Sequence, residues 1–274
     1  MNFIVLCFAF VLTSALPSIT SADILLEYVA RKAGVTESTI GFAAIKDDRI
    51  LFKGAGYSGQ IDILYRRDPE GLVIVDHGKR TMMTVDEQEI ERINQQARYL
   101  LPLVQSLGEQ IGGLSPDQRK KWQKLLGEGI PLDMIARAAG PVVPTSVAST
   151  GEKKVAGMNC RVVQVMRGAK PVVEICFVDA AAIKVSDKDA ETMCAFFDFC
   201  EGLAGKSMVV TGLFGLALPD LVSCDVKGIP VELVDLSGRN MGAMTLDRID
   251  RSSLSPDFIE LPVGYRMVPL TLWP

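Results

Sequence analysis

The sequence predicts an α+β fold in which a long helical block interrupts an antiparallel β-sheet. Residues 40–85 alternate short strand-like runs with turn signals, and a helical pattern follows over about 86–139. Strand-like runs return beyond residue 150. Short strands joined by short turns pair as antiparallel neighbours, so we expect an open or partly closed meander rather than a succession of βαβ units.

Residues 1–22 predict a cleavable signal peptide. They carry no charged side chain, and Phe3 to Leu12 form an apolar run that is too short to span a bilayer. Pro17, after the run, breaks any helix, and the small residues before Asp23 suit a signal peptidase. No lysine or arginine precedes the apolar run, and a retained amphiphilic anchor is the alternative. We expect an exported protein with a mature chain of residues 23–274.

The mature chain is long enough for one large domain. Its charge argues against a nucleic-acid partner. The net charge of the sequence is −4 at pH 7, whereas nucleic-acid-binding proteins usually present a basic face. The concentrated basic stretch, Arg119 to Lys124, has the helical spacing of a solvated face. The apolar run over 208–222 contains Pro219 and Asp220, which favours core packing over a membrane span. We therefore expect neither a nucleic-acid partner nor a membrane span after cleavage.

Turn residues divide both β regions into strand-like runs. In the first region, the expected strands cover residues 39–45, 50–53, 61–66, 72–75 and 81–85. In the second region, we expect a hairpin over 160–177 and strands over 230–235, 242–248 and 265–272. Residues 140–150 are rich in Pro, Ser and Thr and predict a connector between the helices and the hairpin.

Thr84 and Glu87 have the spacing of a capping box, which predicts the start of a helix. Apolar residues then recur at steps of three and four, so one stripe of this helix is expected to face the core, with a kink or break at Pro102. The stripe consists of Ile90, Ile93, Ala97, Leu100, Val104, Leu107 and Ile111. Further helices are expected from Ser115, over 131–139 and over 186–203.

The sequence contains six cysteines, and five remain once Cys7 is removed with the signal peptide. The five are Cys160, Cys176, Cys194, Cys200 and Cys224. Export makes disulfide pairing the first question for them. If the hairpin loop is Arg167 to Ala169, Cys160 lies directly opposite Cys176, where a disulfide can form. Two free core thiols are the alternative.

Cys194 and Cys200 lie on the expected helix about 120° apart, so they should not bond to each other. Either could pair with Cys224, which lies in a strand-like run. Because five is an odd number, at least one thiol is left over or pairs between chains. None of the spacings is C-x-x-C, which argues against a thioredoxin-like motif or a structural zinc site.

No catalytic or metal-binding constellation is recognisable in the sequence. The single histidine, His77, lies in Asp76-His77-Gly78, a setting that turn chemistry explains. One histidine cannot build a poly-histidine zinc site, and no Asp/Glu cluster has the spacing of a calcium loop. Asp76 and Asp86 are a carboxylate pair that turn and helix-cap chemistry also explain. We therefore expect no enzyme, no cofactor and no metal.

Several local segments carry a resemblance to a known family. They are ILYRRDPEGLVIVDHGKRTMMTVDEQE (63–89), LSPDQRKKWQ (114–123), GEKKVAGMNCRVVQVMRGAKPVVEICFVD (151–179) and the closing GIPVELVD and LPVGYR. They resemble an uncharacterised family of exported bacterial proteins, a domain of unknown function similar in fold to the periplasmic lipoprotein carriers LolA and LolB. The family's G-x-x-C…C hairpin falls here on Gly157, Cys160 and Cys176.

The resemblance implies a single LolA-like α+β domain over 23–274, with a helical insertion at about 86–139. Such a domain is a curved antiparallel half-barrel whose concave side is covered by helices, and it implies a periplasmic location. In the carriers the apolar hollow holds acyl chains. We expect a non-enzymatic periplasmic protein that binds a lipid, an acyl chain or an apolar segment of another envelope protein. The alternative is a thiol-active or redox-responsive envelope protein that uses an unpaired cysteine.

Overall fold

The computed structural model describes residues 23–31, 38–55, 60–126, 132, 135–136, 145–207, 228–238 and 242–271. The expected signal peptide, most of the helix expected over 131–139, the 208–222 run and Cys224 lie outside these residues. The helices in the described ranges are α1 (Glu87–Gly112), α2 (Pro116–Leu126), α4 (Asp187–Lys206) and the short 3-10 helix η1 (Pro256–Ile259).

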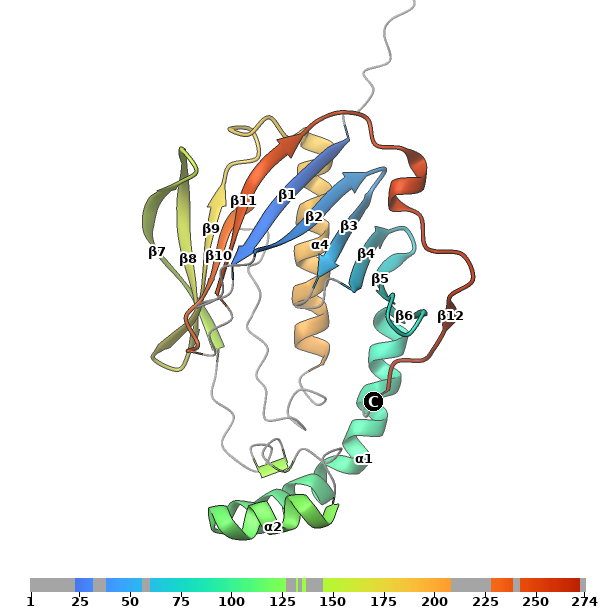
Figure 1. Ribbon diagram of the computed structural model, residues 1–274, viewed down its shortest axis with the longest axis vertical. Helices are drawn as coiled ribbons and strands as arrows, with labels where there is room; N and C mark the ends of the chain where they lie inside the picture. Colours follow the sequence, from blue (N-terminus) through green and yellow to red (C-terminus); the bar gives the residue numbers. More distant parts are fainter. Residues whose placement is uncertain are drawn as a thin grey trace, which may run out of the picture.

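The strands are β1 (Ile24–Arg31), β2 (Ser38–Lys46), β3 (Arg49–Ala55), β4 (Ile61–Arg67), β5 (Glu70–Asp76), β6 (Thr81–Val85), β7 (Thr145–Val155), β8 (Met158–Arg167), β9 (Lys170–Val178), β10 (Ile229–Asp235), β11 (Ala243–Asp250) and β12 (Arg266–Met267). They form one open sheet in the order β12-β6-β5-β4-β3-β2-β1-β11-β10-β9-β8-β7. All neighbours are antiparallel except β12 and β6, which are parallel. Figure 1 shows a curved sheet with α4 on one side. The predicted α+β class and the open, largely antiparallel sheet are confirmed.

Strand β1 lies at the centre of the sheet, between β2 and β11, and is not among the expected strands. Its alternate residues Ile24, Leu26 and Tyr28 are buried, as expected for a strand with one face on the core. Its partner strand β11 comes from the far end of the sequence, where Asp250 lies opposite Leu25. β1 therefore joins the first meander to the strands of the second β region.

Residues 145–155 form the edge strand β7, where the sequence predicts a connector as far as residue 150. The turn Ala156-Gly157 has φ values of 48° and 83°, which suit a two-residue hairpin reversal. β7 therefore folds back along the whole of β8. The sequence pattern did not predict β7 because its side chains are mostly polar. An edge strand is held mainly by backbone pairing with its neighbour, so it can lack the apolar side chains of a buried strand. The strand expected over 265–272 is reduced to the two residues of β12.

Strands β8 and β9 meet at the two-residue turn Gly168-Ala169 rather than at a three-residue loop. An irregularity between Val165 and Met166 shifts the register further, so Val162 lies opposite Cys176. The expected direct opposition of Cys160 and Cys176 is therefore wrong. The two cysteines lie diagonally across the hairpin, with their Cα atoms 5.5 Å apart.

Helix α1 begins after Asp86, whose Oδ1 accepts a hydrogen bond from the Glu89 amide at 2.8 Å. The expected Thr84–Glu87 capping box is wrong because Thr84 lies in β6. The helix also continues through Pro102 without interruption. Its stripe is buried on both sides of the proline, at Ala97 and Val104, and this packing offsets the lost hydrogen bond.

Different parts of the chain cover the two faces of the sheet. Helix α4 packs on one face, formed by side chains such as Ile45 and Tyr65, which we call the inner face. The C-terminal segment, residues 251–271, crosses the opposite, outer face, where Leu254 and Ile259 join its apolar cluster. Both faces are therefore buried along β2 to β5.

Lys46 and Asp23 fasten the C-terminal segment to the outer face. Lys46 Nζ lies 2.7 Å from Asp23 Oδ2 and donates to the Leu254 carbonyl at 2.8 Å. The Leu254 amide donates to Asp23 Oδ2 at 2.7 Å. Burial alone would raise the pKa of Asp23, but Lys46, the Leu254 amide and Ser253 outweigh it and lower the pKa. Asp23 is therefore an ionised, nearly buried carboxylate that depends on Lys46.

Candidate functional site

The inner face is apolar across most of the sheet. Because side chains alternate along a strand, every second residue of β1 to β4 and of β8 to β11 points to this face. The buried members are Ile24, Leu26, Tyr28, Ala43, Ile45, Ile50, Tyr65, Cys160, Val162, Cys176, Val178, Ile229, Val231 and Leu246. Helix α4 therefore rests on a wide apolar surface.

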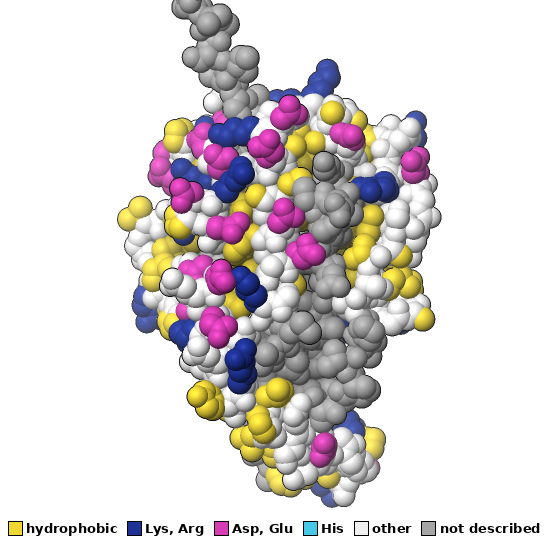
Figure 2. All heavy atoms as spheres, turned by 180° about the vertical axis from the view of Figure 1, so that it is seen from behind, with side chains coloured by type: hydrophobic (Ala, Val, Ile, Leu, Met, Phe, Trp, Pro, Cys, Tyr) yellow, Lys and Arg dark blue, Asp and Glu magenta, His cyan; other side chains and the backbone are white. Residues whose placement is uncertain are grey.

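Helix α4 places a row of phenylalanines over this surface. The ring centroid of Phe196 lies 5.1 Å from that of Phe52, 5.5 Å from that of Tyr65 and 5.6 Å from that of Phe197. The Phe199 centroid lies 5.7 Å from that of Tyr65. Tyr65 is fully buried, but Phe52 of β3 and the three phenylalanines of α4 (Phe196, Phe197 and Phe199) are only half-buried. Figure 2, seen from this side, shows hydrophobic side chains at the surface among charged ones.

A cavity of about 300 Å³ lies between the start of α1 and the second half of α4. Its lining residues are Glu70, Glu87, Asp198, Phe199, Gly202, Leu203 and Lys206. Lys206 Nζ lies 2.7 Å from Glu87 Oε1, and the Tyr65 hydroxyl donates to Glu70 Oε1 at 3.2 Å. Burial and the Glu70 carboxylate raise the pKa of Tyr65 and keep its phenol neutral. Three carboxylates against one ammonium make this cavity acidic, so it does not suit an acyl chain.

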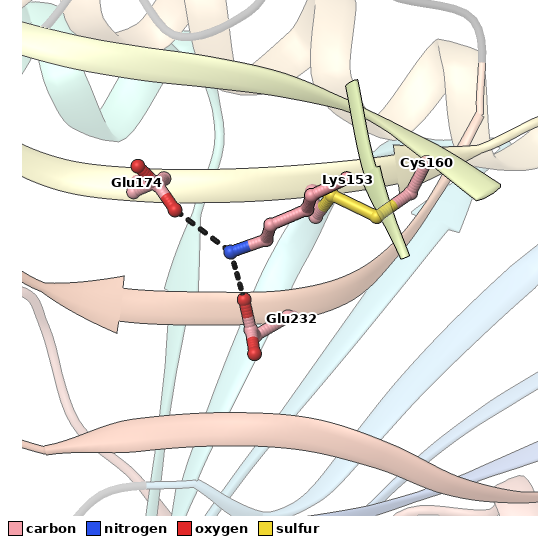
Figure 3. The surroundings of a disulfide bond; sticks show 5 residues. Lys153, Cys160, Glu174 and Glu232 are labelled. Atoms are coloured by element: carbon pink, nitrogen blue, oxygen red, sulfur yellow. Dashed lines mark hydrogen bonds and ion pairs between the residues drawn. A yellow bond between two sulfur atoms is a disulfide. The ribbon is translucent and has the colours of Figure 1, made fainter. Parts of the chain in front are cut away.

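An ion cluster around Lys153 bounds the inner face near β7 (Figure 3). Lys153 Nζ lies 2.7 Å from Glu174 Oε1 and also contacts Glu232. Gln164 donates to Glu174 Oε2 at 2.9 Å. Lys153 and Gln164 lower the pKa of Glu174; burial works against the charged form of Lys153, but the two carboxylates outweigh it and raise the pKa of Lys153. Lys153 pairs with Cys160 across the strands, so the cluster shares a face with the disulfide.

The described cysteines differ in their chemical state. Cys160 and Cys176 form a disulfide on the inner face, both almost fully buried. Cys194 is also disulfide-bonded. Cys200, on α4, is a free thiol, and burial raises its pKa to about 11. At neutral pH roughly one Cys200 in 10,000 is therefore a thiolate, which is the reactive form.

Cys200 is expected to react with a thiol reagent such as DTNB at least roughly 100-fold more slowly than a free cysteine at neutral pH, because so little of it is ionised. Stopped-flow titration of the native mature chain measures this rate. The Cys200→Ala variant isolates the signal of this thiol, and denaturant should make the wild-type thiol fully reactive. Rapid native labelling that Cys200→Ala abolishes would revive the redox-responsive alternative.

His77 is part of an anchor for the C-terminal segment. His77 Nε2 lies 2.9 Å from Asp62 Oδ2, and its Nδ1 lies 3.0 Å from the Tyr265 hydroxyl. Both ring nitrogens are thus engaged by groups from distant parts of the sequence. Sequence reasoning identified the turn but missed Asp62 and Tyr265, since no local pattern links them to it. Asp86 is not part of this anchor, because its carboxylate caps α1.

The described residues contain neither a metal-binding cluster nor a membrane-spanning helix. Within them, no group of three or more His, Cys, Asp or Glu side chains could hold a metal ion. No helix among them is long and apolar enough to cross a membrane. The fold and the site together define an α+β protein with an open curved sheet and a largely apolar inner face.

No family model matches the chain, and no curated protein matches it. Among solved structures, the chain is similar to an uncharacterised conserved protein from Thermus thermophilus, with 7% identity over 91% of each chain and a TM-score of 0.40. It is also similar to MucB in complex with MucA(peri), with 10% identity and a TM-score of 0.27. A Pseudomonas aeruginosa MucA/MucB complex has the same two values. The match covers 90% of this chain but only 57% and 58% of those two chains. Function therefore has to follow from this chain's own residues.

Proposed function

We propose that this protein is an exported, non-enzymatic binding protein with a LolA-like half-barrel and an inserted helical block. Its ligand is an acyl chain or an apolar segment of another envelope protein. The ligand lies against the inner face, beside the phenylalanine row of α4. The half-buried state of Phe52, Phe196, Phe197 and Phe199 is the observation that carries the proposal.

A row of half-buried aromatic rings favours binding over pure core packing. A large apolar side chain that only fills a core is normally buried completely, as those of Tyr65 and Ile50 are. Each ring has a large apolar area, and covering what remains exposed contributes about 25 cal/mol per Å². An apolar ligand that covers several rings together therefore gains substantial affinity.

The polar groups around the inner face support a binding role rather than a reaction. The Lys153 cluster is internally paired, and the phenol of Tyr65 is held neutral. The free thiol of Cys200 is also kept neutral by burial. These groups can orient the polar end of a ligand, but none is poised as a nucleophile or base near neutral pH.

Phe197→Glu is expected to lower the affinity for a fluorescent fatty acid, or for an apolar peptide, at least about tenfold because it puts a charge on the binding surface. Fluorescence titration of the purified mature chain measures the affinity, and mass spectrometry under gentle conditions identifies any co-purifying lipid. Phe258→Glu is the matched control, since Phe258 is a half-buried phenylalanine of the outer face.

Thermal unfolding monitored by circular dichroism shows whether both variants fold, and Phe197→Ala provides a milder change at the same position. Equal losses in Phe197→Glu and Phe258→Glu would contradict a site on the inner face. A ligand-free chain that takes up neither fatty acid nor apolar peptide would overturn the proposed function.

A further inference from the structure

Helix α1 carries a second apolar row that faces solvent. Tyr99, Leu103 and Leu107 follow one another at steps of four and are 86%, 58% and 40% exposed. The sequence placed Leu107 in the buried stripe, and that assignment is wrong. On α2, Trp122 is 48% exposed. Figure 2 shows hydrophobic side chains gathered at the end of the molecule where α1 and α2 lie.

Helix α2 lies at the same end of the molecule as the second half of α1 (Figure 1), and it concentrates positive charge there. Lys120, Lys121 and Lys124 are exposed, and within the described ranges none of them has an ion-pair partner. Lys121 lies about 100° around the helix from Trp122. The whole chain carries a net charge of −4, so this basic end contrasts with the rest of the molecule.

We propose that the α1–α2 end docks on an anionic phospholipid surface. Trp122, Tyr99 and Leu103 enter the interfacial layer, where tryptophan and tyrosine are favoured, and the lysines of α2 approach the lipid phosphates. The acidic body is repelled by the same surface, which orients the molecule with this end toward the membrane. The basic charge favours a lipid surface over an uncharged protein groove. This docking is independent of what the inner face binds.

Flotation with lipid vesicles tests the proposal on the mature chain. The chain is expected to float with vesicles of phosphatidylcholine and phosphatidylglycerol in equal parts, but not with phosphatidylcholine alone, and added salt should weaken the binding. Replacing Lys120, Lys121 and Lys124 by glutamine should lower the apparent affinity by roughly 10- to 100-fold. Leu103→Ser should weaken binding without removing its salt dependence.

A charge-matched variant controls for net charge. Lys79, Lys154 and Lys170 are exposed lysines elsewhere on the molecule, and replacing them by glutamine changes the total charge equally. This variant should bind nearly as the wild type does, and unfolding curves of all variants should coincide. Equal losses in the two triple variants would overturn the proposal, since the effect would then be due to total charge. No binding to anionic vesicles would also overturn it and leave a protein partner for the exposed row.

Tryptophan fluorescence reports on the depth of this end. The sequence has two tryptophans, and Trp273→Phe leaves Trp122 as the sole emitter. Emission should shift to shorter wavelength with anionic vesicles, because the indole leaves bulk water. Binding without any shift would overturn the insertion of Trp122.

Discussion

Replacing Lys46 with methionine is expected to lower the free energy of unfolding by about 3 kcal/mol at neutral pH. Both side chains of the Lys46–Asp23 pair are nearly buried, with 14% and 10% exposed. Without the ammonium, the partners that the Asp23 carboxylate keeps among the described residues are the Leu254 amide and Ser253. The C-terminal segment also loses the bond from Lys46 to the Leu254 carbonyl. Urea unfolding at neutral pH measures the loss.

The pH dependence gives this prediction a second readout. The pKa of Asp23 is lowered in the folded chain, so its contribution to stability is present above the unfolded value of about 3.9. That contribution disappears as the pH falls through the folded pKa. The difference between wild type and Lys46→Met should therefore shrink in strong acid.

An exposed ion pair provides the control for Lys46. Lys188 and Asp48 lie 3.4 Å apart and are about half-exposed, so Lys188→Met should cost less than about 1 kcal/mol. The double variant Asp23→Asn/Lys46→Met should recover part of the loss, because it removes the unpaired charge. Equal effects of Lys46→Met and Lys188→Met would contradict the role assigned to the buried pair.

Removing the disulfide by Cys160→Ala/Cys176→Ala is expected to cost about 3 kcal/mol. The bond joins two cysteines with a sequence separation of 16. Without it, the unfolded chain gains conformational entropy in this segment. Both cysteines are also buried in the inner face, so alanine leaves space there. Chemical unfolding of the double variant and of the wild type, both without reductant, measures the effect, because reductant would also break the disulfide of Cys194.

Cys200→Ala is the matched control for the disulfide. It removes a thiol of the same size that has no covalent partner, so the loss should be clearly smaller. A double variant as stable as Cys200→Ala would show that the disulfide does not hold the hairpin.

Local patterns predicted the elements whose signals are short in range. The hairpin of β8 and β9, the strands of the first meander and helices α1, α2 and α4 follow from periods of two and 3.6 residues. The first half of edge strand β7 was not predicted because its side chains are mostly polar. The cap of α1 was predicted at Thr84, but it is Asp86. The register of the hairpin depended on one loop residue and one irregularity, which composition does not reveal.

The sequence by itself determined the α+β class, the antiparallel pairing of neighbouring strands and the hairpin that carries Cys160 and Cys176. Only the tertiary structure decided that β1 pairs with β11, that Asp23 holds Leu254 across a separation of 231 residues, and which faces of α1 and α4 stay exposed. The physical reason is range. Periodicity and turn chemistry act over a few residues, whereas packing and buried ion pairs join groups that only the complete fold brings together.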